Sequence, residues 1–385
     1  MDAKTVEART EGPGAATTAQ GGRYCTHIAR NRTTLPQSRR PGRLRPMIKI
    51  DAGTAGGSIT QLADTAKAAE AAGFSGLVTA EAAHDPYLPL MVYAAHTQRV
   101  ELLTAIAVAF PRSPMTTAYT AWDLQRYSKG RFILGLGTQV KGHNERRFSV
   151  AWDRPGPRLK DLILSLRAIW DCWQNGTPLQ YEGEFYHFSL MTPFFNPGPH
   201  KYPQIPIYIA GVNPYMCRLA GQLCEGFHVH PIHTAKYINQ VVRPLIAEGA
   251  AITGRDPAKV QLVSGCFVVM GDNDEEIAAS SMAIKQQIAF YASTRTYHSI
   301  LKVHGWEDVG AKLSELSRQG AWDRMAEEVP DEMLAAMAVI GRRDEIGSLL
   351  KDKYDGLLDR ISLYLPYSPN TDRDWWQDVV RTVTA

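Results

Sequence analysis

Cysteine is scarce in this sequence and occurs in no pattern that would cross-link the chain or bind zinc. The five cysteines are odd in number, lie far apart and form no CxxC pair: Cys25, Cys172, Cys217, Cys224 and Cys266. Neither a disulfide framework nor a zinc knuckle is indicated. The cysteine content therefore fits a reducing compartment such as the cytoplasm.

Long hydrophobic runs and an excess of one charge are also absent. No stretch approaches the roughly 18 consecutive apolar residues of a membrane-spanning helix, and residues 1–46 lack the apolar segment of a secretion signal. The 385 residues include 42 Lys and Arg against 39 Asp and Glu, and 44% are hydrophobic. That content is enough to bury a core. We expect a soluble, cytoplasmic, globular protein with no membrane partner.

Residues 1–46 differ in composition from the rest of the chain. They hold nine Lys or Arg against three acidic residues, together with many Gly, Pro, Thr and Gln, and show no apolar periodicity. This composition is typical of disorder. Ser38-Arg39-Arg40 resembles a twin-arginine signal, but no apolar segment follows it, because residues 47–53 have the pattern of a first strand. We expect a disordered basic leader, or translation from upstream of a true start at Met47, rather than a nucleic-acid or membrane tether.

From Met47 on, short apolar runs alternate with helical patterns, which is the rhythm of βα units around a parallel sheet. Eight runs are predicted to be strands: Ile48–Ala52, Ser75–Ala80, Glu101–Val108, Arg131–Gly137, Ile205–Ala210, Gly226–His230, Val260–Met270 and Arg360–Leu365. A doubly wound sheet would usually have fewer strands and a glycine fingerprint after the first. No fingerprint follows Ile50, so we expect an α/β protein with a (β/α)8 TIM barrel over residues 47–385.

The predicted barrel leaves room for two insertions that could form a lid, because such a barrel needs only about 250 residues. One is expected at about 176–203, where residues 181–188 have the pattern of a hairpin. The other is expected at about 291–330. We see no internal repeat and no interdomain linker.

Several motifs in the predicted barrel resemble those of a known superfamily. Residues 131–138 read RFILGLGT and follow RYSKG at 126–130. Further matches are VTAE at 78–81 with HDP at 84–86, PRSP at 111–114, QVKGHNERRF at 139–148, IYIAGV at 207–212, GFHVHP at 226–231 and AFYAST at 289–294. Together they resemble the luciferase-like monooxygenase superfamily, and within it the coenzyme F420-dependent (deazaflavin) branch.

This resemblance implies a luciferase-like (β/α)8 barrel with the cofactor in its C-terminal mouth. It also implies an F420-dependent oxidoreductase, which moves a hydride between the deazaflavin and a small organic substrate: a carbonyl, an alcohol or an activated double bond. Relatives carry a small residue and a β-branched one at the end of strand three, joined by a non-prolyl cis peptide behind the cofactor ring. Ala105 and Ile106, followed by Ala107, match these positions.

The turn after the fourth predicted strand hydrogen-bonds the cofactor in relatives. It corresponds here to Thr138, Gln139 and Val140, and Asn144 is within reach by motif position. Some sugar-phosphate dehydrogenases of the branch place a catalytic Glu just after the Thr, but Val140 or Lys141 stands there in this chain. This departure argues against the sugar-phosphate reaction. Two arginines that follow could pair with phosphate or with glutamyl carboxylates of the cofactor tail, although one of them could equally be solvated: Arg146 and Arg147.

A helix start after the fifth predicted strand favours an anion. The segment is Ala210, Gly211, Val212 and Asn213, followed by a proline. Gly lets the backbone approach a ligand closely, Asn is a good N-cap and Pro fits the first helical position. Unpaired N–H groups at such a helix start attract negative charge. We expect a phosphate of the cofactor to bind there.

Three residues are candidates for catalysis. Relatives often carry an acid or a histidine at the end of strand two, which points to Glu81 and to the nearby His84. His230, at the end of strand six, is expected to be a pocket wall or a proton donor near the substrate. His228 is expected to be an interior polar residue with its hydrogen bonds satisfied.

A metal site is not expected, although His228 and His230 lie two residues apart and would face the same way on a strand. Metal-dependent barrel hydrolases carry such a pair on the first strand and an Asp at the end of the eighth. Here the first strand ends Asp51-Ala52-Gly53 and the eighth ends Leu363-Tyr364-Leu365. A metal hydrolase is therefore the weakest alternative.

Two further alternatives stay open at this point. One is an FMN-dependent luciferase-like monooxygenase, and the other is a noncatalytic barrel that stores or senses a flavin or deazaflavin. The sequence leaves open whether the chain forms a homo-oligomer. Fold resemblance alone does not name the reaction, because this barrel hosts many chemistries.

Overall fold

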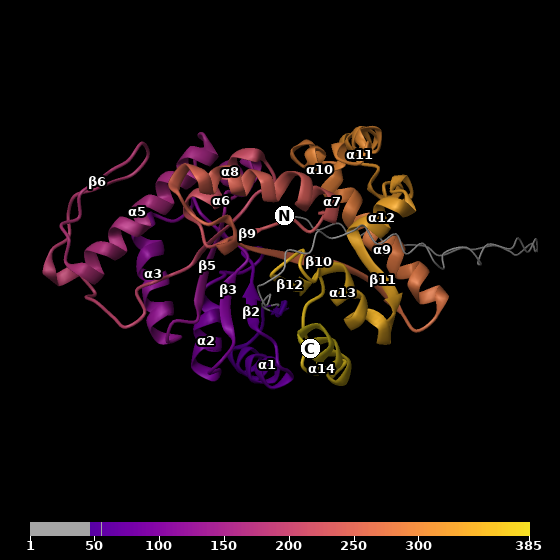
Figure 1. Cartoon of the computed structure of the whole chain (residues 1–385), viewed down its shortest axis with the longest axis horizontal. Coiled ribbons are helices and arrows are strands. Elements are labelled where there is room, and N and C mark those ends of the chain that lie inside the picture. Colours follow the sequence, from indigo (N-terminus) through magenta and orange to yellow (C-terminus); the bar gives the residue numbers. More distant parts are fainter. Residues whose placement is uncertain (1–46, 55) are drawn as a thin grey trace, which may run out of the picture. The chain divides into compact units, whose positions relative to one another are not determined.

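The computed structural model describes residues 47–54 and 56–385, so the expected basic leader at 1–46 lies outside the described residues. In the described part, eight parallel strands form a closed barrel, because β9 and β10 also pair with each other. In order around the barrel they are β1 (Lys49–Gly53), β2 (Gly76–Thr79), β3 (Glu101–Thr104), β5 (Phe132–Gly137), β8 (Ile207–Ala210), β9 (Gly226–His228), β10 (Gln261–Gly271) and β12 (Arg360–Leu363). The expected (β/α)8 barrel is confirmed (Figure 1).

Helices connect and cover the strands, as Figure 1 shows. Those that follow the first strands are α1 (Ile59–Ala72), α2 (Leu88–His96), α3 (Pro114–Tyr127), α4 (Lys141–Arg146), α5 (Pro155–Asn175) and α6 (Pro214–Leu223). Those that follow the later strands are α7 (Ala235–Tyr237), α8 (Arg243–Thr253), α9 (Asp274–Ala292), α10 (His298–Lys302), α11 (Glu307–Gln319), α12 (Asp331–Met337), α13 (Ile346–Tyr354) and α14 (Arg373–Thr384). No helix in the part of the chain that the structure describes is long and apolar enough to cross a membrane.

Local sequence explains where these helices begin and end. Ser58 caps α1, since its side chain accepts a hydrogen bond from the Gln61 N–H while the Gln61 side chain accepts one from the Ser58 N–H. This reciprocal pair is a capping box. Gly73 ends the helix in a left-handed conformation, with φ of 91°, which glycine adopts without a Cβ penalty. Ser113 caps α3 in a similar way and precedes a proline at the first helical position.

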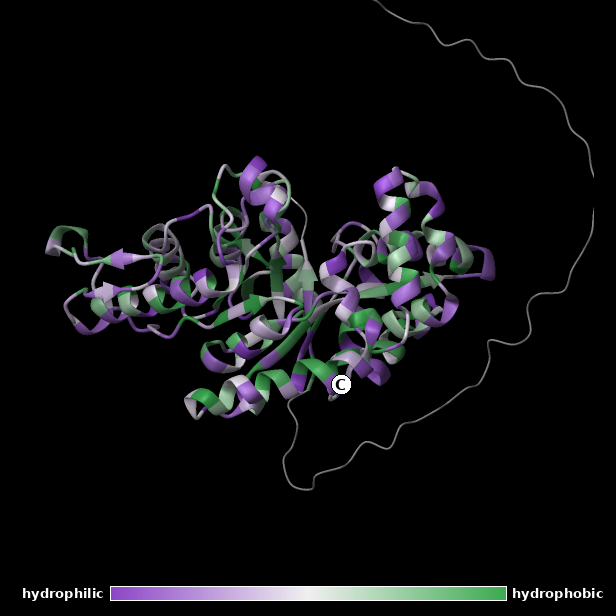
Figure 2. Cartoon of the chain, turned by 90° about the horizontal axis from the view of Figure 1, so that it is seen from above, coloured by the Kyte–Doolittle hydropathy of each residue, from purple (hydrophilic) through white to green (hydrophobic). Residues whose placement is uncertain are grey.

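The strands bury both faces. Leu102 and Leu134 pack in the large core between the barrel and its helices, whereas Leu103 and Ile133 belong to a separate small cluster with Tyr208. Because successive strand residues point to opposite faces, the small cluster is the barrel interior. In Figure 2 the hydrophobic residues lie along the strands and on the helix faces that cover them.

A buried ion-pair network lies toward the N-terminal ends of the strands. Arg360, fully buried at the start of β12, contacts Asp51 Oδ2 through Nε at 2.5 Å and Glu101 Oε2 through Nη2 at 2.5 Å. Lys49 Nζ lies 2.7 Å from the same Glu101 oxygen. A buried arginine needs such partners, because an uncompensated charge in the interior is costly. This end of the barrel is therefore closed by charged side chains that bind one another.

The strands differ from the expectation in two places: the strand expected at 101–108 is divided into β3 and a separate β4 (Ala107–Val108), and one further strand, β11 (Ala338–Arg342), pairs with the expected β10. β10 has 11 residues, and its first half pairs with β9 and β12 in the barrel while Phe267–Gly271 pairs with β11. β11 was not predicted, because its five residues, AVIGR, directly follow a helix and carry no alternating pattern. The barrel sheet thus continues on one side beyond its eight strands.

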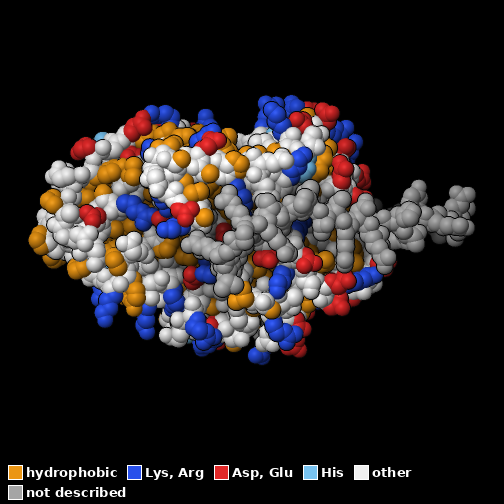
Figure 3. All heavy atoms as spheres, in the orientation of Figure 1, with side chains coloured by type: hydrophobic (Ala, Val, Ile, Leu, Met, Phe, Trp, Pro, Cys, Tyr) orange, Lys and Arg blue, Asp and Glu red, His pale blue; other side chains and the backbone are white. Residues whose placement is uncertain are grey.

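The two segments expected to be insertions have the following structure. Residues 176–203 contain the predicted hairpin, built from antiparallel β6 (Tyr181–Glu182) and β7 (His187–Phe188). They also expose three large apolar side chains, Leu190, Phe194 and Phe195. Figure 3 shows hydrophobic side chains gathered at the left, where Figure 1 places this hairpin beside α5. Residues 291–330 are mostly helical and hold α10, α11 and short 3-10 turns.

Candidate active site

The chain bulges between β3 and a short β4 (Ala107–Val108), at the C-terminal end of the barrel. The Ala105–Ile106 peptide bond in this bulge is cis, as the resemblance implied. The bulge lies against β5, since a Cβ built on Gly137 would meet the Ile106 side chain at 2.8 Å. A glycine is therefore needed on β5 where Ile106 approaches. The role of Ala105, Ile106 and Ala107 toward a cofactor stays a prediction.

Glu81 follows β2 and is tied to the same bulge. Its carboxylate accepts hydrogen bonds from the Val108 N–H at 2.7 Å and from Arg112 Nη1 at 2.7 and 3.0 Å. Its side chain is only 7% exposed. Arg112 also donates to Asp85 Oδ2 at 2.9 Å, so it joins the two loops. These contacts favour a positioning role for Glu81, and its predicted catalytic role is untested.

His84 lies on the exposed loop between Glu81 and Asp85. Its ring lies beside Gly56 on the β1–α1 loop, where an added Cβ would come within 2.6 Å of it. The structure therefore places His84 at the mouth but records no hydrogen bond from it to another described residue. Arg112, which sequence reasoning passed over, is the better-connected residue of this corner. Its position in the PRSP motif was the available signal.

The loop between β5 and α4 is stabilised by side chains of the same segment that hydrogen-bond its backbone. The buried side-chain amide of Asn144 donates to the carbonyl oxygens of Thr138 at 2.9 Å and Val140 at 3.1 Å. Gln139 has a positive φ of 57°, and its Oε1 accepts from the Val140 N–H at 3.0 Å. Asn144 Oδ1 is buried and has no partner among the described residues. Asn144 thus shapes the loop rather than reaching out of it, and its contact with a cofactor remains a prediction.

A basic pocket lies beside this loop. Its volume is about 450 Å³, and its lining residues are Val140, Gly142, His143, Arg146 and Arg147. Arg147 is committed to the protein, because its Nη2 donates to the carbonyl oxygen of Ala82 and its guanidinium lies over the Phe148 ring. Arg146 has no hydrogen bond or ion pair to a described residue that would compete with a ligand. Of the two arginines, Arg146 is therefore the one available to an anion.

The helix start after β8 has the predicted capping. Asn213 Oδ1 accepts a hydrogen bond from the Met216 N–H at 3.0 Å, and Pro214 occupies the first position of α6. Gly211 is required by packing, since an added Cβ would lie 2.4 Å from the Met216 Cβ. The carbonyl of Val212 accepts from the Tyr237 hydroxyl at 3.0 Å. The capping is confirmed, whereas phosphate binding at Ala210–Asn213 stays a prediction.

Three histidines follow one another along β9 and the loop after it. Burial lowers the pKa of His228 to about 4, that of His230 to about 3 and that of His233 to about 4. His228 Nε2 has no partner among the described residues, so the expectation that its hydrogen bonds are satisfied is wrong. The ring sits in the barrel interior against Tyr208 and the close-packed Gly135, and no donor or acceptor reaches it there.

His230 lies two residues beyond the end of β9, among aromatic side chains. Its ring centroid lies 4.3 Å from that of Tyr297 and 4.6 Å from that of Tyr291. Behind it, His233 Nδ1 lies 3.0 Å from the His230 carbonyl oxygen and 3.1 Å from Ser264 Oγ. This contact fixes the backbone that carries the His230 ring.

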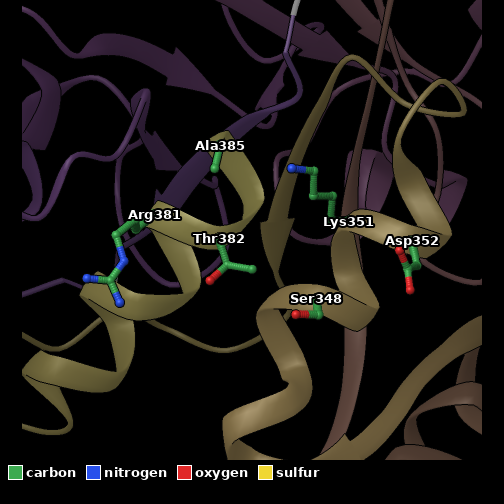
Figure 4. Close-up of a pocket in the computed structure, with 6 residues that line it drawn as sticks. All are labelled: Ser348, Lys351, Asp352, Arg381, Thr382 and Ala385. Carbon is green, nitrogen blue, oxygen red and sulfur yellow. The ribbon is translucent and has the colours of Figure 1, made fainter.

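A metal-binding cluster and a pocket away from the barrel mouth would be two other kinds of site in the described part of the chain. The described residues contain no group of three or more His, Cys, Asp or Glu side chains placed to hold a metal ion. Another pocket, of about 480 Å³, lies between α13 and α14 (Figure 4) and is lined by Ser348, Lys351, Asp352, Arg381, Thr382 and Ala385. None of these residues follows the C-terminal end of a barrel strand, where barrel enzymes place their chemistry.

Comparisons with known proteins agree with this fold. The family model of the luciferase-like monooxygenases matches residues 46–360. An uncharacterized protein of Mycobacterium tuberculosis, Rv1360, is 45% identical over 314 residues, which cover 82% of this chain and 92% of that protein. The 5,10-methylenetetrahydromethanopterin reductase of Methanolobus tindarius is 26% identical over 323 residues, covering 82% and 93%. The solved structure of the coenzyme F420-dependent tetrahydromethanopterin reductase from Methanopyrus kandleri matches with a TM-score of 0.68 at 18% identity, covering 87% and 97%.

The strands define a (β/α)8 barrel, and barrels of this kind carry their functional sites at the C-terminal mouth. The chain belongs to the luciferase-like monooxygenase family.

Proposed function

We propose that this protein is an F420-dependent oxidoreductase that transfers a hydride between a deazaflavin cofactor and an organic substrate. The observation that carries the proposal is the basic pocket at α4, with Arg146 available beside a loop that Asn144 holds in shape. Flavins and deazaflavins share a phosphate, and the deazaflavin adds a tail of glutamyl carboxylates. A pocket lined by His143, Arg146 and Arg147 suits such a tail.

The residues present fit this cofactor at two further positions. At the start of α6, Pro214 has no N–H, and the Met216 and Cys217 N–H groups both hydrogen-bond Asn213. The Tyr215 N–H is therefore the one left for an anion, and a helix N-terminus favours a phosphate. The β3–β4 bulge, with Ile106 against Gly137, offers an apolar surface to a ring. A deazaflavin bound there would supply hydride transfer, and the protein would supply position, desolvation and hydrogen bonds.

The chain's own residues would then act as follows. Arg112 and Glu81 hold the bulge and the β2–α2 loop together, so the apolar surface keeps its shape. His230, uncharged at neutral pH, contacts the substrate side of the mouth as a hydrogen-bonding wall. The helical segment at 291–330 brings Tyr297 against His230 and excludes water from that side.

The test is a pair of titrations of the purified full-length protein, one with coenzyme F420 and one with FMN, followed through the fluorescence of each cofactor. We expect the deazaflavin to bind more tightly. A substrate panel with the preferred cofactor, followed at the cofactor absorbance, then measures hydride transfer.

The same titrations separate the alternatives. Tighter binding of FMN, with oxygen-dependent turnover, would indicate a monooxygenase, which the family also contains by name. Tight binding without turnover across the panel would indicate a noncatalytic binding barrel. We further propose a small-molecule substrate, no nucleic-acid partner and a cytoplasmic location. Size-exclusion chromatography with light scattering would show whether the chain is a homo-oligomer.

A further inference from the structure

Four aromatic side chains meet at one side of the barrel mouth, and we call them the aromatic wall: His230, Tyr291, Tyr297 and Tyr364. His230 and Tyr364 lie just beyond the C-terminal ends of β9 and β12. Tyr291 is in the last turn of α9, and Tyr297 ends the 3-10 turn that follows. Ring contacts join His230 to Tyr291 and Tyr297, and Tyr291 to Tyr364 at 6.4 Å between centroids. Strand ends and an inserted segment thus build one surface.

Three members of the aromatic wall, His230, Tyr291 and Tyr297, carry no charge at neutral pH. Burial lowers the pKa of His230 to about 3, and it raises the pKa of Tyr291 and of Tyr297. The imidazole is therefore uncharged, and both phenols keep their protons. Among the described residues, the ionisable neighbours that affect the pKa of His230 and Tyr297 are His233 and Tyr364. A charged ligand would find no counter-ion in them.

Two hydrogen-bond donors remain on this neutral surface. The hydroxyls of Tyr291 and Tyr364 hydrogen-bond each other, and the Gln287 side chain also hydrogen-bonds the Tyr291 hydroxyl. When Gln287 is the donor, the pair uses one of its two O–H groups internally and leaves the other for an outside acceptor. His230 Nδ1 accepts from the Ile232 N–H at 3.4 Å, so the hydrogen of the neutral ring lies on Nε2, which is a second donor. Such donors suit a carbonyl oxygen, which only accepts.

The surface around the wall is apolar and continues to solvent. Phe290 packs on Tyr291 at 5.4 Å between centroids and on Trp322 at 6.1 Å. Phe290 is 50% exposed and Trp322 43%, and Leu365 is also exposed beside the wall. Exposed large apolar side chains that cluster at a site often bind a ligand. A substrate with an apolar body would lie along this rim.

We propose that the aromatic wall selects an uncharged carbonyl substrate with a planar apolar body, whose oxygen accepts hydrogen bonds from the Tyr291–Tyr364 hydroxyl pair and from His230. This inference rests on the proposed function, and it narrows the substrate to one class. It excludes phosphorylated and carboxylated substrates.

The test compares three ligands of the same ring system on the full-length protein: 2-acetylnaphthalene, 2-ethylnaphthalene and 2-naphthoate. Binding is measured by ligand-observed NMR, with and without the preferred cofactor, so it needs no turnover. We expect the ketone to bind about 3- to 10-fold more tightly than the hydrocarbon, because it gains one or two hydrogen bonds. We expect the carboxylate to bind more weakly than the hydrocarbon. A carboxylate that binds as tightly as the ketone would overturn the proposal.

Variants assign the effect to the hydroxyl pair. Because either hydroxyl can donate to the ketone once its partner is gone, the double variant Tyr291→Phe/Tyr364→Phe is used, which keeps both rings and removes both hydroxyls. We expect it to weaken binding of the ketone about 3- to 10-fold and to leave binding of the hydrocarbon unchanged. Tyr127→Phe, which removes an exposed hydroxyl on α3, is the matched control. Equal ratios of ketone to hydrocarbon affinity in wild type, the double variant and Tyr127→Phe, with unchanged melting temperatures, would contradict the role of the pair.

The failure of this inference differs from the failure of the proposed function. If neither cofactor binds, but the ketone binds more tightly than the hydrocarbon and loses this advantage without the hydroxyl pair, the proposed function is wrong and the proposed role of the aromatic wall is supported. If the deazaflavin binds but the ketone binds no more tightly than the hydrocarbon, cofactor binding is supported and the proposed role of the wall is wrong. The wild-type ligand series alone decides the case if a variant does not fold.

Discussion

Glu81 shows how a carboxylate at a strand end can have a use other than catalysis. Its two oxygens are taken by Arg112 and the Val108 N–H, and its side chain is nearly buried. The sequence showed an acid at the end of β2, but it could not show that an arginine 31 residues later would reach it. Partner choice between distant loops depends on the folded barrel, which is why the role assigned from position alone was incomplete.

We expect Glu81→Gln to lower the free energy of unfolding by about 2–3 kcal/mol, because it leaves Arg112 without its main partner. Urea denaturation measures the change. Glu248→Gln is the matched control: it removes an exposed partner of Arg218 at 2.8 Å, which should cost less than about 1 kcal/mol. A variant that keeps its stability and cofactor affinity but loses turnover would instead establish catalysis by Glu81.

At the scale of elements, all eight barrel strands and the hairpin were predictable, because each has a compact β-rich pattern bounded by turn residues. The N-terminal cap of α6 could also be predicted from the sequence, because Asn213 and Pro214 act on neighbouring residues of the same helix. Neither β11 nor the aromatic wall could be predicted from the sequence. β11 is defined only by its pairing with the second half of β10, and Tyr364 meets Tyr291 across 73 residues of sequence. Contacts of that kind follow from tertiary packing rather than from local pattern.

The α4 element separates two arginines that look alike in the sequence. We expect Arg146→Gln to weaken deazaflavin binding about 3- to 10-fold and to reduce its salt dependence, because an available guanidinium can pair with an anionic tail. Arg147→Gln should lower stability as well, since Arg147 holds the carbonyl of Ala82. Fluorescence titrations at two ionic strengths measure both effects, with the exposed Arg126→Gln on α3 as control. If Arg146→Gln and wild type bind the deazaflavin with equal affinity, α4 is not part of the cofactor site.

At the scale of the whole molecule, the three buried histidines make stability depend on pH. Their pKa values of about 3 to 4 in the folded state lie below the 6.5 of an unfolded histidine. Between these values the unfolded chain binds more protons, so the free energy of unfolding should fall as the pH drops from about 6.5 toward 4. Each histidine contributes up to about 1.4 kcal/mol per pH unit in that window.

Urea denaturation from pH 7.5 to pH 5 measures this slope. His228→Gln should make it shallower, because it removes one of the three groups, whereas His96→Gln on the exposed end of α2 is the control. A slope that is identical in His228→Gln and wild type would show that His228 is not the neutral interior group that the structure places against Tyr208.

The length of β10 has a consequence for how the molecule opens. One half of this strand pairs with β9 and β12, and the other half pairs with β11. A single continuous backbone therefore belongs to the barrel and to the pair with β11, and it leads into α9, which carries Tyr291 of the aromatic wall. Amide hydrogens along such a strand exchange with solvent through shared openings. In deuterium-exchange mass spectrometry, peptides from Phe267–Gly271 should therefore be protected nearly as long as those from Leu262–Cys266. A ligand at the aromatic wall should slow exchange in both halves of β10 together. Slower exchange in Leu262–Cys266, the half farther from the mouth, would then report that a ligand is bound at the mouth.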